Sequence, residues 1–249
     1  MERWQNKIAV VTGASAGIGA AICKALVEQG MIVVGLARRL EKIETQTRSL
    51  IGEKYQKNFH SYKCDVGVEE SVKEAFAWIA MKFGGVDILI NNAGVFKPIK
   101  LIDEDNSQSI SETINTNIMG VIWCTREAFR NMKQRNVDGH IIIINSVAGH
   151  RIPIIPLYSL NAYAPSKHAV TAMTEVLRQE FQTEQTKIKI TSISPGGVRT
   201  EIIGNLPKEY ANIPLLDSKD IADAVVFCIQ TPPHVQIHEM IIKPIGEKS

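Results

Sequence analysis

Tyr163 and Lys167 stand four residues apart, at the start of a segment, 164–181, that has the apolar pattern of a helix. At that spacing two side chains share one helix face, about 5–6 Å apart at Cβ. A nearby cation favours the phenolate and lowers the pKa of a tyrosine, which could then pass a proton to or from a substrate oxygen. Ser146 ends an apolar run, and its hydroxyl could polarise the same oxygen. Alone, Tyr163 and Lys167 could also be a surface helix pair. A glycine-rich turn elsewhere in the chain favours catalysis.

That turn, residues 12–19, reads Thr-Gly-Ala-Ser-Ala-Gly-Ile-Gly and joins the apolar run 8–12 to a helical pattern over 17–29. Glycines let the backbone turn tightly and approach a pyrophosphate, and the helix N-terminus offers free amides to the phosphates. The spacing G-x-x-x-G-x-G differs from the general dinucleotide fingerprint. An ordinary glycine-rich turn is the alternative interpretation. The turn predicts a dinucleotide site that includes Gly13, Ser15, Gly17, Ile18 and Gly19.

The residues after the second apolar run predict which dinucleotide binds. An NAD enzyme usually carries an acidic residue at the end of this strand, but here Ala37 is followed by Arg38 and Arg39. A guanidinium can hold a 2′-phosphate through charge-assisted hydrogen bonds. The sequence therefore predicts NADP(H), with Arg38 as the principal contact and Arg39 beside it. The alternative is that both arginines belong to the solvated start of the next helix.

Short apolar runs alternate with amphipathic stretches along the whole chain. The runs, most of them rich in Ile or Val as buried parallel strands are, predict strands over 8–12, 32–36, 59–65, 87–91, 140–146, 187–194 and 236–243. Helical patterns cover 17–29, 69–83, 108–132, 164–181 and 217–230. This alternation predicts an α/β fold: a doubly wound, Rossmann-like, seven-stranded parallel sheet with helices on both faces. No repeat or linker divides the chain, so we expect one domain over 1–249.

Composition narrows the choice of partners. The chain has 249 residues and a net charge of +2, which argues against nucleic acid as a partner. Its apolar runs are too short for a membrane span, and its first residues lack the character of a signal peptide, so we expect a cytoplasmic protein. The four cysteines form no CxxC pair. His234 and His238 would lie about 13 Å apart on a strand, so no metal site is expected.

Taken together, these motifs resemble the single-domain short-chain dehydrogenase/reductase family from about residue 7 to residue 245. The matching motifs follow in the family's order: Thr12-Gly13-x-x-x-Gly17-x-Gly19, Asn91-Asn92-Ala93-Gly94, Asn117 with Gly120, Ser146, and Tyr163-x-x-x-Lys167. A nicotinamide-side loop, Pro195-Gly196-Gly197-Val198-Arg199-Thr200, comes after them. Ordered motifs of this kind make the resemblance highly specific.

The resemblance implies further roles for individual residues. Asn117 would interrupt a helix and hold a water that links Lys167 to solvent, and Lys167 would also bind the nicotinamide ribose. The remaining cofactor contacts that it implies are Asp65 and Val66 at the adenine, Asn92, Ala93 and Gly94 at the adenosine-side ribose, and Pro195, Gly196, Val198 and Thr200 on the nicotinamide side. We also expect a homodimer or a homotetramer.

Some segments carry a closer likeness within the family. Asn145 stands where many members have a second serine. The segments 147–151, 166–172 and 232–239 are similar to those of the insect NADP-dependent farnesol dehydrogenases and of a related mammalian reductase of keto-steroids. Either likeness implies an apolar, terpenoid or steroid-like substrate.

Two apolar loops, at about 150–162 and 200–216, are candidates for the substrate side of the site. The stretch 153–160 within the first could instead form an interface or ordinary packing. We thus expect an NADP(H)-dependent oxidoreductase that interconverts an apolar alcohol and its aldehyde or ketone. An epimerase or dehydratase of the same fold is one alternative, and a non-catalytic NADP(H)-binding redox sensor or scaffold is another. Intact Ser146, Tyr163 and Lys167 favour redox catalysis.

Overall fold

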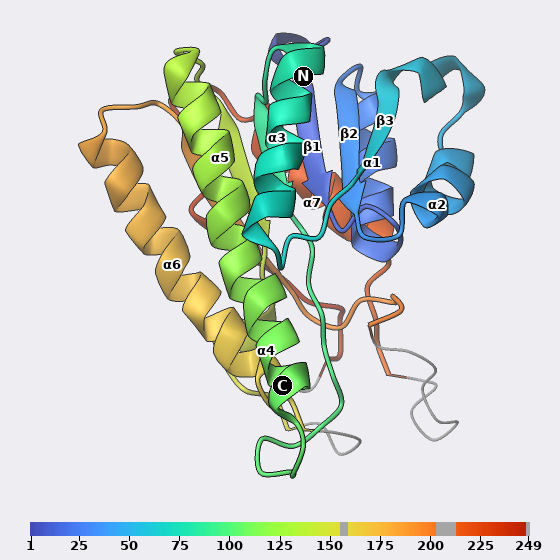
Figure 1. The fold of residues 1–249 in the computed structure, drawn as a ribbon, viewed down its shortest axis with the longest axis vertical. Helices are drawn as coiled ribbons and strands as arrows, with labels where there is room; N and C mark the ends of the chain where they lie inside the picture. Colours follow the sequence, from blue (N-terminus) through green and yellow to red (C-terminus); the bar gives the residue numbers. More distant parts are fainter. Residues whose placement is uncertain (155–158, 203–212, 248–249) are drawn as a thin grey trace.

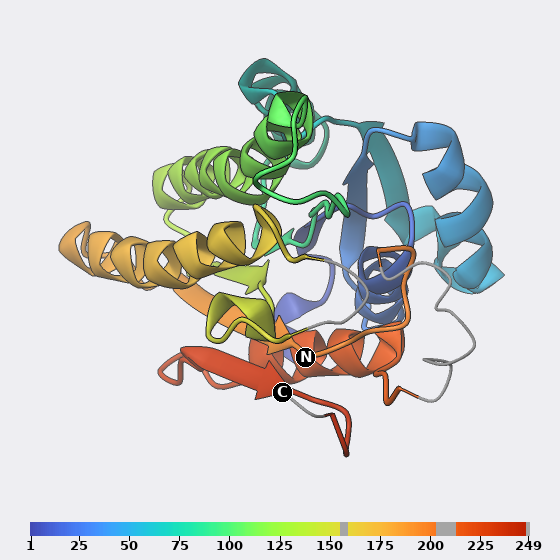
Figure 2. The same ribbon diagram turned by 90° about the horizontal axis from the view of Figure 1, so that it is seen from below.

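The computed structural model describes residues 1–154, 159–202 and 213–247. Seven strands form one parallel sheet in the order β3-β2-β1-β4-β5-β6-β7 (Figures 1 and 2). The strands are β1 Ile8–Thr12, β2 Ile32–Ala37, β3 Phe59–Lys63, β4 Ile88–Asn91, β5 His140–Ile144, β6 Lys189–Pro195 and β7 Glu239–Ile242. The doubly wound α/β fold predicted from the sequence is thereby confirmed.

The strands form where the sequence places runs of β-branched residues that can be buried on both sides. Every residue of β1, β4, β5 and β6 is buried, as expected for inner strands covered by helices on both faces. The predicted ends differ from the observed ones by up to three residues: β3 stops at Lys63, β5 stops at Ile144, β6 begins at Lys189 and β7 covers only Glu239–Ile242.

Helices cover both faces of the sheet. The helices α1 Gly17–Glu28 and α7 Ser218–Gln230 pack on one face, where Ile22, Leu26 and Val225 are fully buried. The opposite face, turned toward the viewer in Figure 1, carries α3 Glu69–Phe83, α5 Gly120–Gln134 and α6 Tyr163–Thr183. Two apolar cores therefore fix the sheet from both sides and hold the carboxyl ends of its strands in place.

The helical segment predicted over 108–132 consists of three parts. α4 Ser107–Ile114 passes through a π-helical turn, Asn115–Met119, directly into α5. A π turn holds one residue more than an α turn and is frequent at functional sites. Asn117 lies in the middle of this turn, so the interruption that the family resemblance implied at this residue is present.

The segment 40–58 was not predicted as structured. It forms the short helix α2 Leu40–Lys42, a π-helical turn Ile43–Thr47, and 3-10 turns at Arg48–Leu50 and Glu53–Asn58. The hydroxyl of the buried Thr47 donates a 2.7 Å hydrogen bond to the carbonyl of Ala14. This bond ties the segment to the glycine-rich turn, and so helps to shape the site.

The order of the strands determines where a ligand can bind. The chain moves from β1 outward to β2 and β3, then returns to β4 beside β1 and continues in the other direction. At such a switch point the connections diverge and leave a crevice at the carboxyl ends of the strands. Figure 2 looks onto this edge of the sheet from below, with the loops after β1, β4, β5 and β6 around it.

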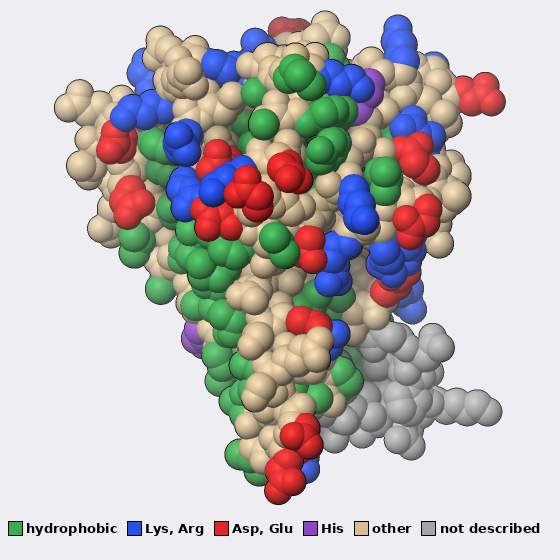
Figure 3. Space-filling model, in the orientation of Figure 1, with side chains coloured by type: hydrophobic (Ala, Val, Ile, Leu, Met, Phe, Trp, Pro, Cys, Tyr) green, Lys and Arg blue, Asp and Glu red, His purple; other side chains and the backbone are tan. Residues whose placement is uncertain are grey.

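The surface in Figure 3 carries Lys and Arg side chains interspersed with Asp and Glu, while apolar side chains gather lower down over α5 and α6. Among the described residues, no helix is both long enough and apolar enough to cross a membrane. Within the same residues, no group of three or more His, Cys, Asp or Glu side chains is arranged to hold a metal ion.

Candidate active site

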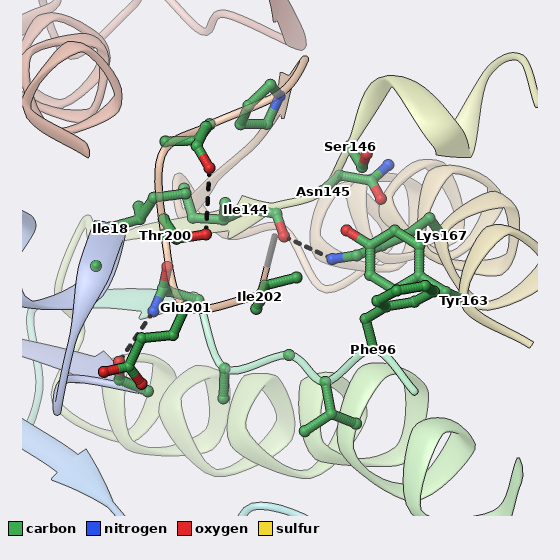
Figure 4. A pocket seen from close by; sticks show the side chains of 18 of the residues that line it. Ile18, Phe96, Ile144, Asn145, Ser146, Tyr163, Lys167, Thr200, Glu201 and Ile202 are labelled. Carbon is green, nitrogen blue, oxygen red and sulfur yellow. Dashed lines mark hydrogen bonds between the residues drawn. The ribbon is translucent and has the colours of Figure 1, made fainter. Parts of the chain in front are cut away.

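A cavity of about 750 Å³ opens at the carboxyl ends of the strands (Figure 4). The sequence-predicted residues in its wall are Gly13, Ser15, Gly17, Ile18, Arg38, Arg39, Asp65, Val66, Asn92, Ala93, Gly94, Ser146, Tyr163, Lys167, Pro195, Gly196, Val198 and Thr200. Gly19 and Asn117 were also predicted, but they lie behind the wall. The fold thus brings predicted site residues from Gly13 to Thr200 together around one cavity.

The glycine-rich turn forms one side of the cavity in a way that only glycine permits. Gly13 has a φ of +67°, and a Cβ there would lie 2.8 Å from the Cα of Ala93. A Cβ at Gly19 would lie 2.3 Å from the carbonyl oxygen of Gly13, so Gly19 lets the first turn of α1 pack against the loop. Asn92 closes the arrangement by donating a 2.9 Å hydrogen bond to the carbonyl of Thr12. The result is a tight cradle of bare backbone beside the cavity.

Cationic side chains line the end of the cavity after β2. Arg38 makes no hydrogen bond or ion pair with any residue that the structure describes. The guanidinium of Arg39 lies 3.5 Å from the hydroxyl of Ser15 in the glycine-rich turn. Ala37, at the end of β2, is 8% exposed and leaves no acid at this position. An anionic group could therefore reach Arg38 without first displacing a protein carboxylate from it.

Ser146, Tyr163 and Lys167 lie together on the opposite side of the cavity (Figure 4). Tyr163 is the first residue of α6, and the Nζ atom of Lys167 lies 5.7 Å from the centre of its ring. Lys167 donates a 3.0 Å hydrogen bond to the carbonyl of Ile144, and burial lowers the pKa of its ammonium group to about 8. At neutral pH most molecules therefore keep a positive charge beside the phenol ring.

Asn117 lies behind the cavity wall and is linked to Tyr163 through Ser166. Its amide donates to the carbonyl of Val95 at 3.0 Å and to the hydroxyl of Ser166 at 3.1 Å, and its oxygen accepts from the backbone N–H of Val95 at 2.9 Å. Ser166 in turn donates to the carbonyl of Tyr163 at 2.6 Å. The side chain of Asn117 thus fastens the loop after β4 to the first turn of α6.

Two further residues that support Tyr163 were not found from the sequence. The ring of Phe96 meets that of Tyr163 edge-on, with centroids 5.6 Å apart. Asn161 has a φ of +32°, accepts a 3.2 Å hydrogen bond from the backbone N–H of Tyr163, and donates to the carbonyl of Lys97. Neither belongs to a motif, because each acts through a contact between segments far apart in the chain. Together they attach the loop 92–106 to the start of α6.

We expect Asn161→Asp to lower the melting temperature by about 2–8 °C and to reduce kcat/KM. Aspartate keeps the acceptor for the N–H of Tyr163 and tolerates this backbone conformation, but it places an anion against the carbonyl of Lys97. Calorimetry and steady-state kinetics provide the two measurements. Asn136→Asp is the matched control, since Asn136 is exposed and also has a positive φ, +52°. Equal melting temperatures for the two variants would contradict the bridging role of Asn161.

The ends of the two apolar loops contribute to the cavity wall. Pro153, Ile154 and Leu160 lie there from the first loop, and Ile202, Ile213, Pro214 and Leu215 from the second. The apolar residues predicted at 155–158 and 203–212 lie outside the described residues. His150, which follows the 3-10 turn after Ser146, is outside the wall and instead contacts the Ser194 hydroxyl at 3.1 Å and Glu239 at 2.8 Å. The described ends of both loops thus add apolar side chains to the cavity wall.

The sheet order, the glycine-rich turn and the cavity at the switch point together define a Rossmann-like α/β protein. The chain belongs to the short-chain dehydrogenase family, whose model matches residues 7–211.

Individual relatives extend this likeness over the whole chain. The chain is 50% identical to a farnesol dehydrogenase of Aedes aegypti over 248 residues, all of both chains. It is 43% identical to dehydrogenase/reductase SDR family member 11 of Homo sapiens over 98% of this chain and 96% of the human one. Among solved structures, a serine dehydrogenase in complex with NADP⁺ superposes with a TM-score of 0.84 at 29% identity, over 97% of this chain and 96% of the other.

Proposed function

We propose that this protein is an NADP(H)-dependent oxidoreductase that interconverts an apolar alcohol and its aldehyde or ketone. The substrate class is a terpenoid such as farnesol, or a molecule of similar shape and polarity such as a steroid. One observation carries the proposal: the wall of a single cavity contains the cationic Arg38, the glycine-rich turn, the pair Tyr163 and Lys167, and the apolar ends of two loops.

The residues present fit a bound dinucleotide. Gly13 and Gly17 place backbone without side chains in the cavity wall, where a pyrophosphate could bind, and Gly19 lets α1 pack closely behind them. Arg38, with Arg39 beside it, would hold the 2′-phosphate. Asp65 and Val66 would lie at the adenine, Asn92 to Gly94 and Lys167 at the two riboses, and Pro195 to Thr200 around the nicotinamide. When bound there, the nicotinamide ring supplies or accepts a hydride.

The chain's own residues would handle the proton and the substrate oxygen. In reduction, the Tyr163 hydroxyl donates a proton to the oxygen of the carbonyl, and in oxidation the phenolate takes it back. The Lys167 ammonium beside the ring favours the phenolate. Ser146 donates a hydrogen bond to the same oxygen and so polarises the carbonyl. Asn117 positions α6 and, in our proposal, also supports the path by which the proton reaches solvent.

Similar proteins support the same reaction class. A relative that is 50% identical over its whole length is named a farnesol dehydrogenase, and a structural neighbour is a complex with NADP⁺. In this chain, an apolar substrate is supported by the apolar loop ends around 153–160 and 202–215, which lie in the cavity wall.

We expect kcat/KM to rise along a series of primary allylic alcohols of five, ten and fifteen carbons, with NADP⁺ held at saturation. Burying one more methylene contributes about 0.8 kcal/mol, so a few additional buried groups should raise kcat/KM at least tenfold. Reduced-nicotinamide absorbance provides the measurement, and a short polar sugar alcohol serves as the control. A flat or falling series would contradict an apolar substrate pocket, while absence of turnover with every alcohol and carbonyl would contradict the proposed reaction.

A further inference from the structure

We propose that Glu201 is a determinant of cofactor selectivity: its carboxylate, held by Lys42, competes with the 2′-phosphate of NADP(H) for Arg39, and so lowers the preference for NADP(H) over NAD(H). The inference rests on the proposed function and adds an acidic residue beside the cations that would hold the 2′-phosphate.

Glu201 directly follows Thr200, the last residue of the nicotinamide-side loop, and lies in the wall of the same cavity as Arg38 and Arg39. Its carboxylate forms a close ion pair with the Nζ atom of Lys42 and lies 3.5 Å from Nη2 of Arg39. These two cations hold the pKa of Glu201 below its usual range, with the hydrogen bond from Lys42 as the main cause. Figure 4 shows Glu201 at the end of the cavity remote from Tyr163.

The position of Arg39 connects this ion pair to the cofactor site. The Nη2 atom of Arg39 that faces Glu201 also lies 3.5 Å from the hydroxyl of Ser15 in the glycine-rich turn. One guanidinium edge is thus shared between the turn that would hold the phosphates and the carboxylate of Glu201. An anion that binds between Ser15 and Arg39 meets a cation already engaged by a protein carboxylate.

A carboxylate and a phosphate are alternative ligands for the same cationic donors. When a 2′-phosphate binds, Glu201 can lose its contact with Arg39, which costs the free energy of that ion pair. If Glu201 stays in place, its negative charge repels the phosphate. In both cases the binding of NADP(H) is weakened. A 2′-hydroxyl carries no charge, so Glu201 has little effect on NADH. The side chain of Lys42 is only 15% exposed, whereas that of Glu201 is 57% exposed, so the carboxylate is the partner free to move away.

The test is a comparison of dissociation constants for NADPH and NADH, measured by cofactor fluorescence at fixed moderate salt. Glu201→Gln keeps the size of the side chain and removes its charge. We expect it to lower the dissociation constant for NADPH about two- to fivefold, the range for an exposed ion pair, and to leave that for NADH unchanged. In a Lys42→Gln background the same substitution should have a smaller effect, since the main partner of Glu201 is gone.

Asp223→Asn is the matched control. Asp223 is 59% exposed and pairs with Lys219 on α7, but it is outside the cavity wall, so its substitution removes the same charge at a distance from the site. If Glu201→Gln leaves NADPH binding unchanged, weakens it, or tightens NADH binding equally, the inference is wrong. A wild-type protein that binds NADPH more tightly than NADH would still support the proposed function in that case. A wild-type protein that binds neither cofactor would overturn both.

Discussion

Replacement of Tyr163 by phenylalanine should lower kcat by about 10²–10⁴-fold while NADPH still binds. Phenylalanine preserves the ring that meets Phe96 edge-on and lies 5.7 Å from the ammonium of Lys167, and only the hydroxyl is lost. Without it, no group in our proposal can exchange a proton with the substrate oxygen. Steady-state kinetics and a binding titration with NADPH provide the two measurements.

Tyr62→Phe is the control for this experiment. Tyr62 lies on β3, packs its ring against Trp78 at 4.7 Å and is outside the cavity wall, so loss of its hydroxyl should leave kcat unchanged. A Tyr163→Phe protein that keeps more than about a tenth of the wild-type kcat would show that another group acts as the acid and base.

The second large effect concerns the cofactor. Wild type should prefer NADPH to NADH in kcat/KM, and Ala37→Asp combined with Arg38→Leu should reverse this preference. Arg38 makes no hydrogen bond or ion pair with the described residues and interacts with Glu112 only at longer range, so its guanidinium can bind a 2′-phosphate directly. A hydrogen bond to a charged group contributes about 1.5–3 kcal/mol, which corresponds to about ten- to a hundredfold in discrimination.

The two substitutions act through attraction and repulsion. An aspartate at the end of β2 can accept a hydrogen bond from a ribose hydroxyl, and its charge repels a phosphate. Kinetics with both cofactors should be run at one salt concentration, because salt screens exposed charges. Arg39 and Lys42 remain in the variant and restrict the loss of NADPH use, because they still supply positive charge. Equal use of both cofactors by the wild-type protein would exclude Arg38 as the discriminating residue.

The sequence predicted the sheet well because its strands are buried. β1 and β5 consist largely of Ile and Val, which marks an inner strand without any knowledge of its neighbours. Segment 40–58 escaped prediction because its helical turns are only three to six residues long. Such turns contain too few residues to show an apolar period, and contacts such as that of Thr47 with Ala14 hold them in place.

The site was predictable where its residues form local motifs. The glycine-rich turn and the Tyr163–Lys167 spacing are visible within a few residues of sequence. Asn161 and Glu201 could not be found in this way, since Asn161 acts on the carbonyl of a residue 64 positions away and Glu201 on a lysine 159 positions away. Asparagine and glutamate are common on surfaces, so only the folded arrangement distinguishes these two.

The π-helical turn at Asn115–Met119 affects how the length of the continuous helix formed by α4, this turn and α5 can vary. Each residue of an α-helix advances about 100° around the axis, so the one surplus residue offsets the azimuth of α4 from that of α5 by about that angle. Val121, Cys124, Ala128 and Met132 fix the azimuth of α5 against the sheet. The direction in which Asn117 points is therefore set by residue count rather than by side-chain identity. Insertions or deletions in this stretch can therefore change the direction of the Asn117 side chain while α5 keeps its contacts with the apolar core.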